Sequence, residues 1–370
     1  MLAISYITAH FLFASAKYLF TQNCKAPSGV EFFDGFSQSE LKQDADLARR
    51  DLAKDAKIAR RRAYAFDSLR LYTIRRVKMQ SVFLRFPNGR SKAVTFSYDD
   101  GVPQDKRLAE MFTAYGIKAT FNFNSKGSRP TAFSDEEIQE IFLSKGHEIA
   151  VHGAYHRANG NVRAIEGIRD VLDGRLELEK RCGTIIRGMA YPDTGINQLS
   201  SNISYEKIKS YLIELDIAYA RTDGGKNEKF RLPEDFYAWV PTAHHDDPQI
   251  MEYIDKFLKT KTSQASYHAQ RSSRLLFIWG HSYEFDRNDN WEHIESICKA
   301  LSGNDDLWFA TNIEIHDYIE AYNRLIYSAD GSKVYNPTLH TIWLEFCSEL
   351  FTVRPGETVI IPENAPKPIW

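Results

Sequence analysis

Cysteine is scarce in this sequence, and the few cysteines present stand far apart. Cys24, Cys182, Cys298 and Cys347 form no CxxC pair. This spacing argues against a disulfide framework and against a structural zinc knuckle. Scattered thiols suit a reducing compartment, so we expect a cytoplasmic protein.

Net charge and uninterrupted apolar runs are lacking as well. The formal net charge of the 370 residues is −2, which gives no electrostatic footprint for nucleic acid. Residues 2–20 are fairly apolar, but polar side chains interrupt them, so we expect no integral membrane span. Ala14-Ser15-Ala16 resembles a signal-peptidase site. A secreted protein with a signal peptide over residues 1–16 is therefore the alternative, although that stretch has no Lys or Arg.

Hydrophobic residues make up 43% of the chain, enough for a full core, and aromatic residues make up 13%. The aromatic content fits a sugar-binding cleft, but an ordinary aromatic core explains it more simply.

Three segments differ in character. Residues 1–78 contain a charged run without glycine or proline over residues 40–62, which predicts an exposed helix in an N-terminal extension. A domain could begin at Met79, so a misassigned start codon is the alternative explanation for this extension. Residues 79–325 form the main domain, and the turn signals in residues 326–370 predict a small β appendage.

The main domain alternates short apolar runs with helical patterns. Such repeated β–α units predict parallel strands with right-handed crossovers, here a distorted (β/α)7 barrel of the α/β class. We expect strands at 93–96, 119–123, 148–151, 185–190, 217–220, 275–279 and 308–311. We expect helices at 106–115, 134–143, 162–181, 204–215, 248–258, 291–301 and 313–325. The chemistry of such barrels lies at the C-terminal ends of the strands.

Asp99 and Asp100 follow the first of these strands and precede Gly101. Adjacent residues at a strand end face different ways, so one carboxylate can bind a metal while the other acts as a base. A plain Asp-Gly turn is the alternative.

His152 and His156 follow the strand at 148–151. Two histidines four residues apart on a helical turn lie on the same side and suit one zinc-like ion, although such pairs also arise by chance. One aspartate plus two histidines would leave coordination positions open, which is typical of a catalytic metal.

Three further segments sit at predicted strand ends. His281 follows the strand at 275–279 and is either a proton donor or a buried core histidine. The loop from Arg187 to Gly195 can aim a backbone N–H at an oxyanion, or is a plain turn. The segment 232–245 is polar and aromatic, and its paired histidines belong either to the site or to an inert surface loop.

In this order the motifs resemble the polysaccharide deacetylase family, also called the NodB-homology domain or carbohydrate esterase family 4. TFSYDDG at 95–101 is similar to its first motif, HGAYH at 152–156 to its HxxxH metal motif, and WGHSYEF at 279–285 to its last motif. The resemblance covers about residues 80–325. It implies the distorted (β/α)7 barrel and one divalent metal ion, with zinc favoured and cobalt an alternative.

The resemblance also implies roles for single residues. Asp99 matches the base, His281 matches the general acid, and Asp100, His152 and His156 match the metal ligands. The third motif of the family has an arginine just before PPYG, and Arg187 is the nearest arginine here, so we include it among the catalytic residues. The predicted substrate-binding residues are Tyr191, Pro192, Asp193, Asp235, Trp239, His244 and His245.

These roles predict a metal-dependent hydrolase that removes acetyl groups, most simply N-acetyl groups, from a carbohydrate. An O-deacetylase or a cyclic-amide amidase on the same scaffold is one alternative. A carbohydrate-binding relative without turnover is another. The glycan and the oligomeric state stay open.

Overall fold

The computed structural model describes residues 82–127, 130–200, 202–223, 226–262 and 271–362. The predicted helix at 40–62, the signal segment at 1–16 and the boundary at Met79 lie outside these residues. Within the described residues, no helix combines the length and the apolar character that crossing a bilayer requires.

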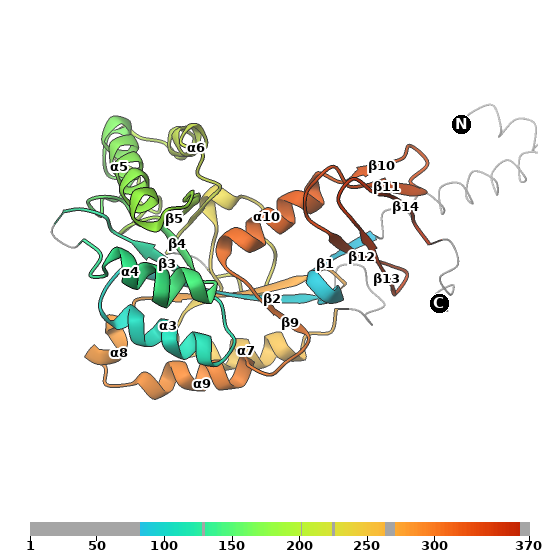
Figure 1. The fold of residues 1–370 in the computed structure, drawn as a ribbon, viewed down its shortest axis with the longest axis horizontal. Coiled ribbons are helices and arrows are strands. Elements are labelled where there is room, and N and C mark those ends of the chain that lie inside the picture. Colours follow the sequence, from blue (N-terminus) through green and yellow to red (C-terminus); the bar gives the residue numbers. More distant parts are fainter. Residues whose placement is uncertain (1–81, 128–129, 201, 224–225, 263–270, 363–370) are drawn as a thin grey trace, which may run out of the picture. The chain divides into compact units, whose positions relative to one another are not determined.

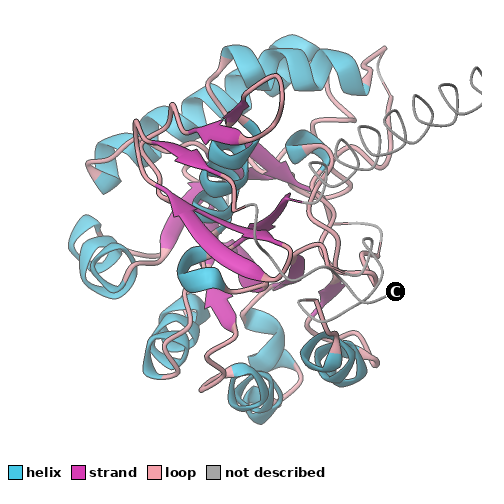
Figure 2. Cartoon of the chain, turned by 90° about the vertical axis from the view of Figure 1, so that its right-hand side faces the viewer, coloured by secondary structure: helices cyan, strands magenta, loops and turns pink. Residues whose placement is uncertain are grey.

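A curled parallel sheet forms the centre of the main domain, and helices surround it (Figure 2). Its strands pair in the order β6-β5-β4-β3-β2-β8-β7, and β9 pairs with the first half of β2. The strands are β2 (Lys92–Asp100), β3 (Thr120–Phe123), β4 (Glu148–Val151), β5 (Gly188–Ala190), β6 (Tyr219–Arg221), β7 (Ala243–His244), β8 (Arg274–Gly280) and β9 (Leu307–Phe309). The predicted distorted (β/α)7 barrel is confirmed.

Helices follow most of these strands along the chain (Figure 1). They are α3 (Gln104–Ala114), α4 (Asp135–Glu137), α5 (Ala164–Cys182), α6 (Tyr205–Glu214), α7 (Ile250–Lys259), α8 (Tyr283–Arg287), α9 (Trp291–Leu301) and α10 (Asn312–Asn323). The helix expected from residue 134 begins at a capping box of Ser134 and Glu137, which satisfies its free N–H groups. It then continues as a π turn (Ile138–Phe142) and a 3₁₀ turn (Leu143–Lys145) rather than as a regular α-helix.

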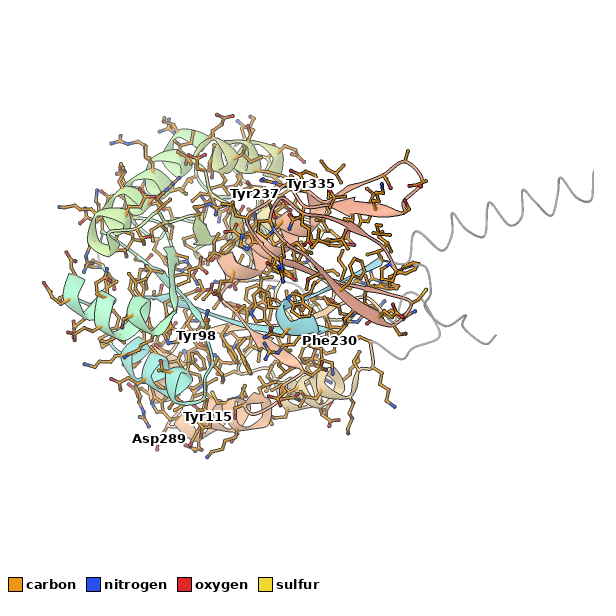
Figure 3. All side chains as sticks on the ribbon, turned by 45° about the vertical axis from the view of Figure 1, so that its right-hand side comes forward. Tyr98, Tyr115, Phe230, Tyr237, Asp289 and Tyr335 are labelled. Atoms are coloured by element: carbon orange, nitrogen blue, oxygen red, sulfur yellow. The ribbon has the colours of Figure 1, made fainter. Side chains whose placement is uncertain are left out.

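The two faces of β2 explain why the sequence builds a barrel. Val94, Phe96 and Tyr98 face the helices, and Phe96 packs on Phe112 of α3 with 4.8 Å between ring centroids. Figure 3 shows side chains filling this space between sheet and helices, with Tyr98 among them. Because side chains alternate along a strand, Asp99 points the other way, into the barrel.

Residues 326–362, within the segment predicted to form a small β appendage, contribute to two antiparallel sheets, and β1 (Val82–Arg85) from the predicted main domain completes one of them. The first joins β1, β12 (Ile342–Phe346) and β13 (Glu349–Val353). The second joins β10 (Ile326–Tyr327), β11 (Lys333–Tyr335) and β14 (Thr358–Ile360). One apolar cluster connects this appendage to the barrel near the start of β2, so it covers the end of the barrel away from Asp99 (Figure 1).

Candidate active site

Two carboxylates leave the end of β2 in different directions. Asp99 is 2% exposed, and Nδ2 of Asn122 donates a hydrogen bond to its Oδ1 at 2.8 Å. Asp100 has a φ of 84°, a left-handed conformation that turns the chain out of the strand. Its Oδ1 instead accepts a hydrogen bond from Nδ2 of Asn124 at 3.1 Å. The two neighbouring carboxylates therefore lie in different environments.

Asp100 lies beside both predicted histidines. Its Oδ1 is 3.6 Å from Nε2 of His152 and 3.4 Å from Nε2 of His156. Nδ1 of His152 is 3.0 Å from the carbonyl oxygen of Ala190. A carbonyl can only accept, so Nδ1 carries the ring proton and Nε2 keeps a lone pair. Burial lowers the pKa of His152 although Asp99 and Asp100 oppose it. One carboxylate and a neutral imidazole aimed at the same point fit a divalent cation such as zinc.

The two histidines come from an irregular loop, not from the helical turn that their spacing suggested. Residues 152–156 follow β4 without helical hydrogen bonds, and His156 itself has a φ of 54°. Asp170 of α5 orders this loop, because its Oδ1 accepts the N–H of Tyr155 at 2.8 Å. A Cβ on Gly153 would lie 2.3 Å from Oδ2 of Asp170, so the loop requires glycine there. The ring positions thus depend on a tertiary contact with α5.

Arg221, at the end of β6, is the cation next to Asp99. Its guanidinium is fully buried and donates from Nη2 to Oδ2 of Asp99. The same group lies over the ring of Trp279, 4.5 Å from the centroid. Burial alone raises the pKa of Asp99, but nearby positive charge, above all the guanidinium of Arg221, outweighs it and holds the pKa below its usual value. Asp99 is therefore ionised at neutral pH, as a base must be.

Arg187, which we had included among the catalytic residues, does not reach this cluster. It precedes β5, whereas the site lies where the strands end, and its Nη1 pairs with Asp317 of α10 at 3.0 and 3.1 Å. The geometry therefore corrects the expectation for Arg187 in favour of Arg221. A usable signal was present, because Arg221 directly follows the strand predicted at 217–220.

His281 lies next to Asp99 across the sheet. The register pairs Tyr98 with Gly280, so Asp99 and His281 are the next residues on two adjacent parallel strands. Nδ1 of His281 is 3.6 Å from Oε2 of Glu284, and its backbone N–H donates to the same oxygen at 3.2 Å. Burial lowers the pKa of His281, but Glu284 and the nearby aspartates raise it above its usual value overall.

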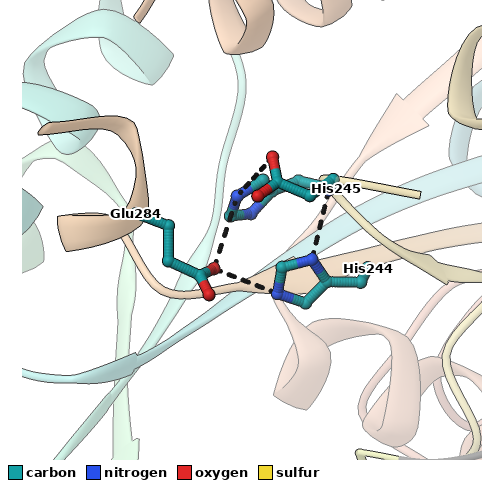
Figure 4. A group of neighbouring side chains, drawn as sticks. His244, His245 and Glu284 are labelled. Carbon is teal, nitrogen blue, oxygen red and sulfur yellow. Dashed lines mark hydrogen bonds and ion pairs between the residues drawn. The ribbon is translucent and has the colours of Figure 1, made fainter. Parts of the chain in front are cut away.

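Glu284 is the second residue that the sequence patterns missed. It lies in the first turn of α8, three residues after His281, which precedes the helix. Nε2 of His244 is 3.1 Å from Oε2 of Glu284 (Figure 4). The N–H of Asp246 donates to Nδ1 of His244 at 3.1 Å, so Nε2 carries the proton in the neutral ring. A second group of possible metal ligands lies here, made of His244, His245, Asp246 and Glu284. With this tautomer, however, Nε2 of His244 donates a hydrogen bond to Glu284 and offers no lone pair to a metal ion.

His245 lies inside the fold, which corrects its prediction as a substrate-binding residue. It is fully buried, and its ring stacks on Tyr98 with 5.6 Å between centroids. Burial, helped by His244, lowers its pKa to about 2, so the ring is neutral. A Cβ on Gly280 would lie 2.0 Å from its Nδ1, which explains the glycine before His281. His244 is 26% exposed at the rim and stays available to a substrate.

Three residues predicted to bind substrate make their contacts within the protein instead. Trp239 is 1% exposed and packs on Phe277 in the cluster beneath the site. Asp235 accepts bonds from Tyr205 and Lys209 of α6. Tyr191 is buried, and its N–H donates to the carbonyl of Arg221 at 2.9 Å, so this N–H is not free for an oxyanion.

The rest of that loop divides between the interior and the surface. Pro192 is buried and has no N–H, while Asp193 stays exposed after β5 with a φ of 54°. Of the two, only Asp193 presents its side chain to solvent.

A family model described as polysaccharide deacetylase matches residues 87–207, which include Asp99, Asp100, His152 and His156. A search of curated proteins found no match.

Several solved structures resemble the chain at low identity. The deacetylase PplD of Streptococcus pyogenes, in complex with acetate, is 16% identical with a TM-score of 0.30, and the match covers 35% of this chain and 55% of PplD. A family 4 acetyl xylan esterase from Clostridium thermocellum, in complex with a cobalt ion, is 16% identical with a TM-score of 0.37, covering 61% and 90%. The chitin deacetylase of the fungus Colletotrichum lindemuthianum is 14% identical with a TM-score of 0.39, covering 60% and 86%. This chain thus spans about half the length of PplD.

Sequence identities this low do not establish an activity for this chain. The family model nevertheless covers the strand ends that carry the aspartate pair and the histidine pair. The resemblance seen in the motifs is confirmed over residues 87–207, which match the polysaccharide deacetylase family model.

Proposed function

We propose that this protein is a metal-dependent hydrolase that removes N-acetyl groups from a carbohydrate. The match of residues 87–207 to the polysaccharide deacetylase family model supports carbohydrate deacetylation. The metal and the preference for N-acetyl groups are the finer parts of the proposal. The observation that carries them lies at one end of the barrel, where an ionised Asp99 and a His281 of raised pKa meet the cluster of Asp100, His152 and His156.

Asp100, His152 and His156 would hold the metal ion. When bound, such an ion polarises a carbonyl group and makes water more acidic. The hydrogen bond from His152 to Ala190 fixes the ring with its lone pair toward the ion.

Asp99 is the base in this proposal. Arg221 and Asn122 hold both of its oxygens in place and keep it ionised, so it can take a proton from the attacking water. Asp99 stays outside the proposed ligand set, since Asp100 is the carboxylate grouped with the two histidines.

His281 is the acid. Glu284 favours its protonated form, so it can deliver a proton to the leaving nitrogen as the amide bond breaks. An amine is a poor leaving group unless it is protonated, whereas an alcohol depends less on this help. A well-supported acid therefore favours N-acetyl over O-acetyl substrates.

The proposal is tested by measuring bound metal and acetate release from N-acetylated and O-acetylated sugars and from a cyclic amide. We expect one divalent ion per chain and preferential release from N-acetyl sugars. His156→Ala should abolish metal binding while the melting curve stays cooperative. Preferred release from O-acetyl sugars or ring opening of the amide would identify the alternative hydrolases. Metal and sugar binding without any acetate release would identify a binding protein and overturn the proposal.

A further inference from the structure

The two strands that carry Asp99 and His281 stop pairing just before these residues. The β2–β8 ladder runs from Lys92 and Arg274 to Tyr98 and Gly280. Beyond it, within the described residues, no backbone hydrogen bond joins residues 101–105 to residues 281–285. The ladder therefore does not by itself fix how far apart the two turns lie.

A buried side-chain contact connects the turns instead. The hydroxyl of Ser282 donates to Oδ1 of Asp105 at 2.5 Å, and both residues are fully buried. Oδ2 of Asp105 accepts the N–H of Val102 at 3.1 Å, which ties the same carboxyl to its own turn. Ser282 directly follows His281, so this contact acts one residue away from the proposed acid.

The buried contact outweighs the other polar link between these segments. Gln104 donates to Asp286 at 2.8 Å, but that pair is exposed, and water competes for it. Burial, with the charges of Asp100 and Asp99 adding to it, raises the pKa of Asp105 well above its usual range. Both oxygens of this carboxyl accept hydrogen bonds, one from each turn. Breaking one of them leaves a buried polar group unpaired, which the chain can relieve only by moving a turn.

We propose that Asp105 and Ser282 are positioning residues, and that their contact holds the turn of His281 at a fixed distance from the turn of Asp99 and Asp100. The inference rests on the proposed function, because it concerns the placement of the general acid. A displacement of about 1 Å can lower a rate by about 100-fold when proton transfer needs a defined geometry.

The test uses two substrates that differ in their need for the acid. An N-acetyl sugar needs a proton on its leaving nitrogen, whereas 4-nitrophenyl acetate releases a stable anion without one. In the full chain, Ser282→Ala and Asp105→Leu should lower kcat for the N-acetyl sugar by about 10-fold to 100-fold, with metal content retained and hydrolysis of 4-nitrophenyl acetate nearly unchanged.

Two further variants separate positioning from stability. Asp105→Asn should recover most of the activity on the N-acetyl sugar, because an amide of the same shape can still accept from the N–H of Val102 and donate to the hydroxyl of Ser282. Thr95→Val is the matched control. It also removes a fully buried hydrogen bond of a hydroxyl group, the one that Thr95 of β2 donates to Asn312 at 2.8 Å. It should lower the melting temperature without changing the ratio of the two rates.

His281→Ala is the reference for the acid. If it loses the N-acetyl substrate selectively and Ser282→Ala does not, the positioning inference is overturned while the proposed function stands. If His281→Ala lowers both rates equally, the acid role itself fails. Equal loss of both substrates in Ser282→Ala, or a loss in Asp105→Asn as large as in Asp105→Leu, would also overturn the inference.

Discussion

At the scale of single residues, each of the two proposed proton-transfer groups lies beside a partner of opposite charge. Arg221 donates a hydrogen bond to Asp99, and Glu284 lies next to Nδ1 of His281. Each partner favours the charged form of its neighbour. The pKa of Asp99 is lowered and that of His281 is raised, although burial opposes both shifts. Activity should therefore fall at low pH as Asp99 gains a proton and at high pH as His281 loses one, which gives a bell-shaped profile.

Arg221→Met should move the low-pH limb of that profile to higher pH. Without the guanidinium, burial raises the pKa of Asp99, so the carboxylate is lost earlier as pH falls. The pH dependence of kcat is the measurement, with Arg187→Met as the control, because Arg187 pairs with Asp317 instead. An acidic limb that shifts in Arg187→Met but not in Arg221→Met would restore the original assignment.

Glu284→Gln should move the high-pH limb to lower pH. The carboxylate favours the imidazolium, so its removal lowers the pKa of His281, and the acid deprotonates earlier as pH rises. Asp99→Asn should lower kcat by about 100-fold or more at every pH, and His281→Ala should remove the high-pH limb. Glu295→Gln, on the outer surface of α9, serves as the control. An unmoved limb in Glu284→Gln would exclude Glu284 as the partner of the acid.

At the scale of elements, the loop after β4 depends on α5. Asp170 accepts the N–H of Tyr155 and approaches that of Arg157, so it holds the backbone on both sides of His156. Asp170→Ala should weaken metal binding by about 10-fold to 100-fold, the usual effect of losing a group that orients a ligand. Competition with a chelator measures this. Asp173→Ala, one turn along the same helix, should leave the affinity unchanged, and equal affinity in both variants would contradict this role of Asp170.

At the scale of the whole molecule, a buried ion pair joins the first described strand to the C-terminal segment inside one antiparallel sheet of the appendage. Arg85 of β1 lies 3.0 Å from Glu345 of β12, with side chains 1% and 4% exposed, and Arg271 also reaches Glu345 at 2.9 Å. Glu345→Ala should lower the free energy of unfolding by about 3–5 kcal/mol, because it leaves a buried charge unpaired.

Urea unfolding measures that loss, and the site should be spared by it. The pair lies at the opposite end of the barrel, so metal content and acetate release per folded chain should not change. If Glu345→Ala lost metal without losing stability, the appendage would be coupled to the site in a way that its position does not explain.

The sequence alone determined the barrel and the strand ends that carry Asp99, Asp100, His152, His156 and His281. These follow from local rules, because hydrophobic periodicity defines the strands and parallel strands bring their C-terminal ends together. Only the tertiary structure decided which side chains meet across the barrel. Arg221 rather than Arg187 reaches Asp99, and His245 turns inward while His244 stays at the rim. Such contacts join residues more than a hundred positions apart, and strand curvature and burial set them, neither of which a local pattern records.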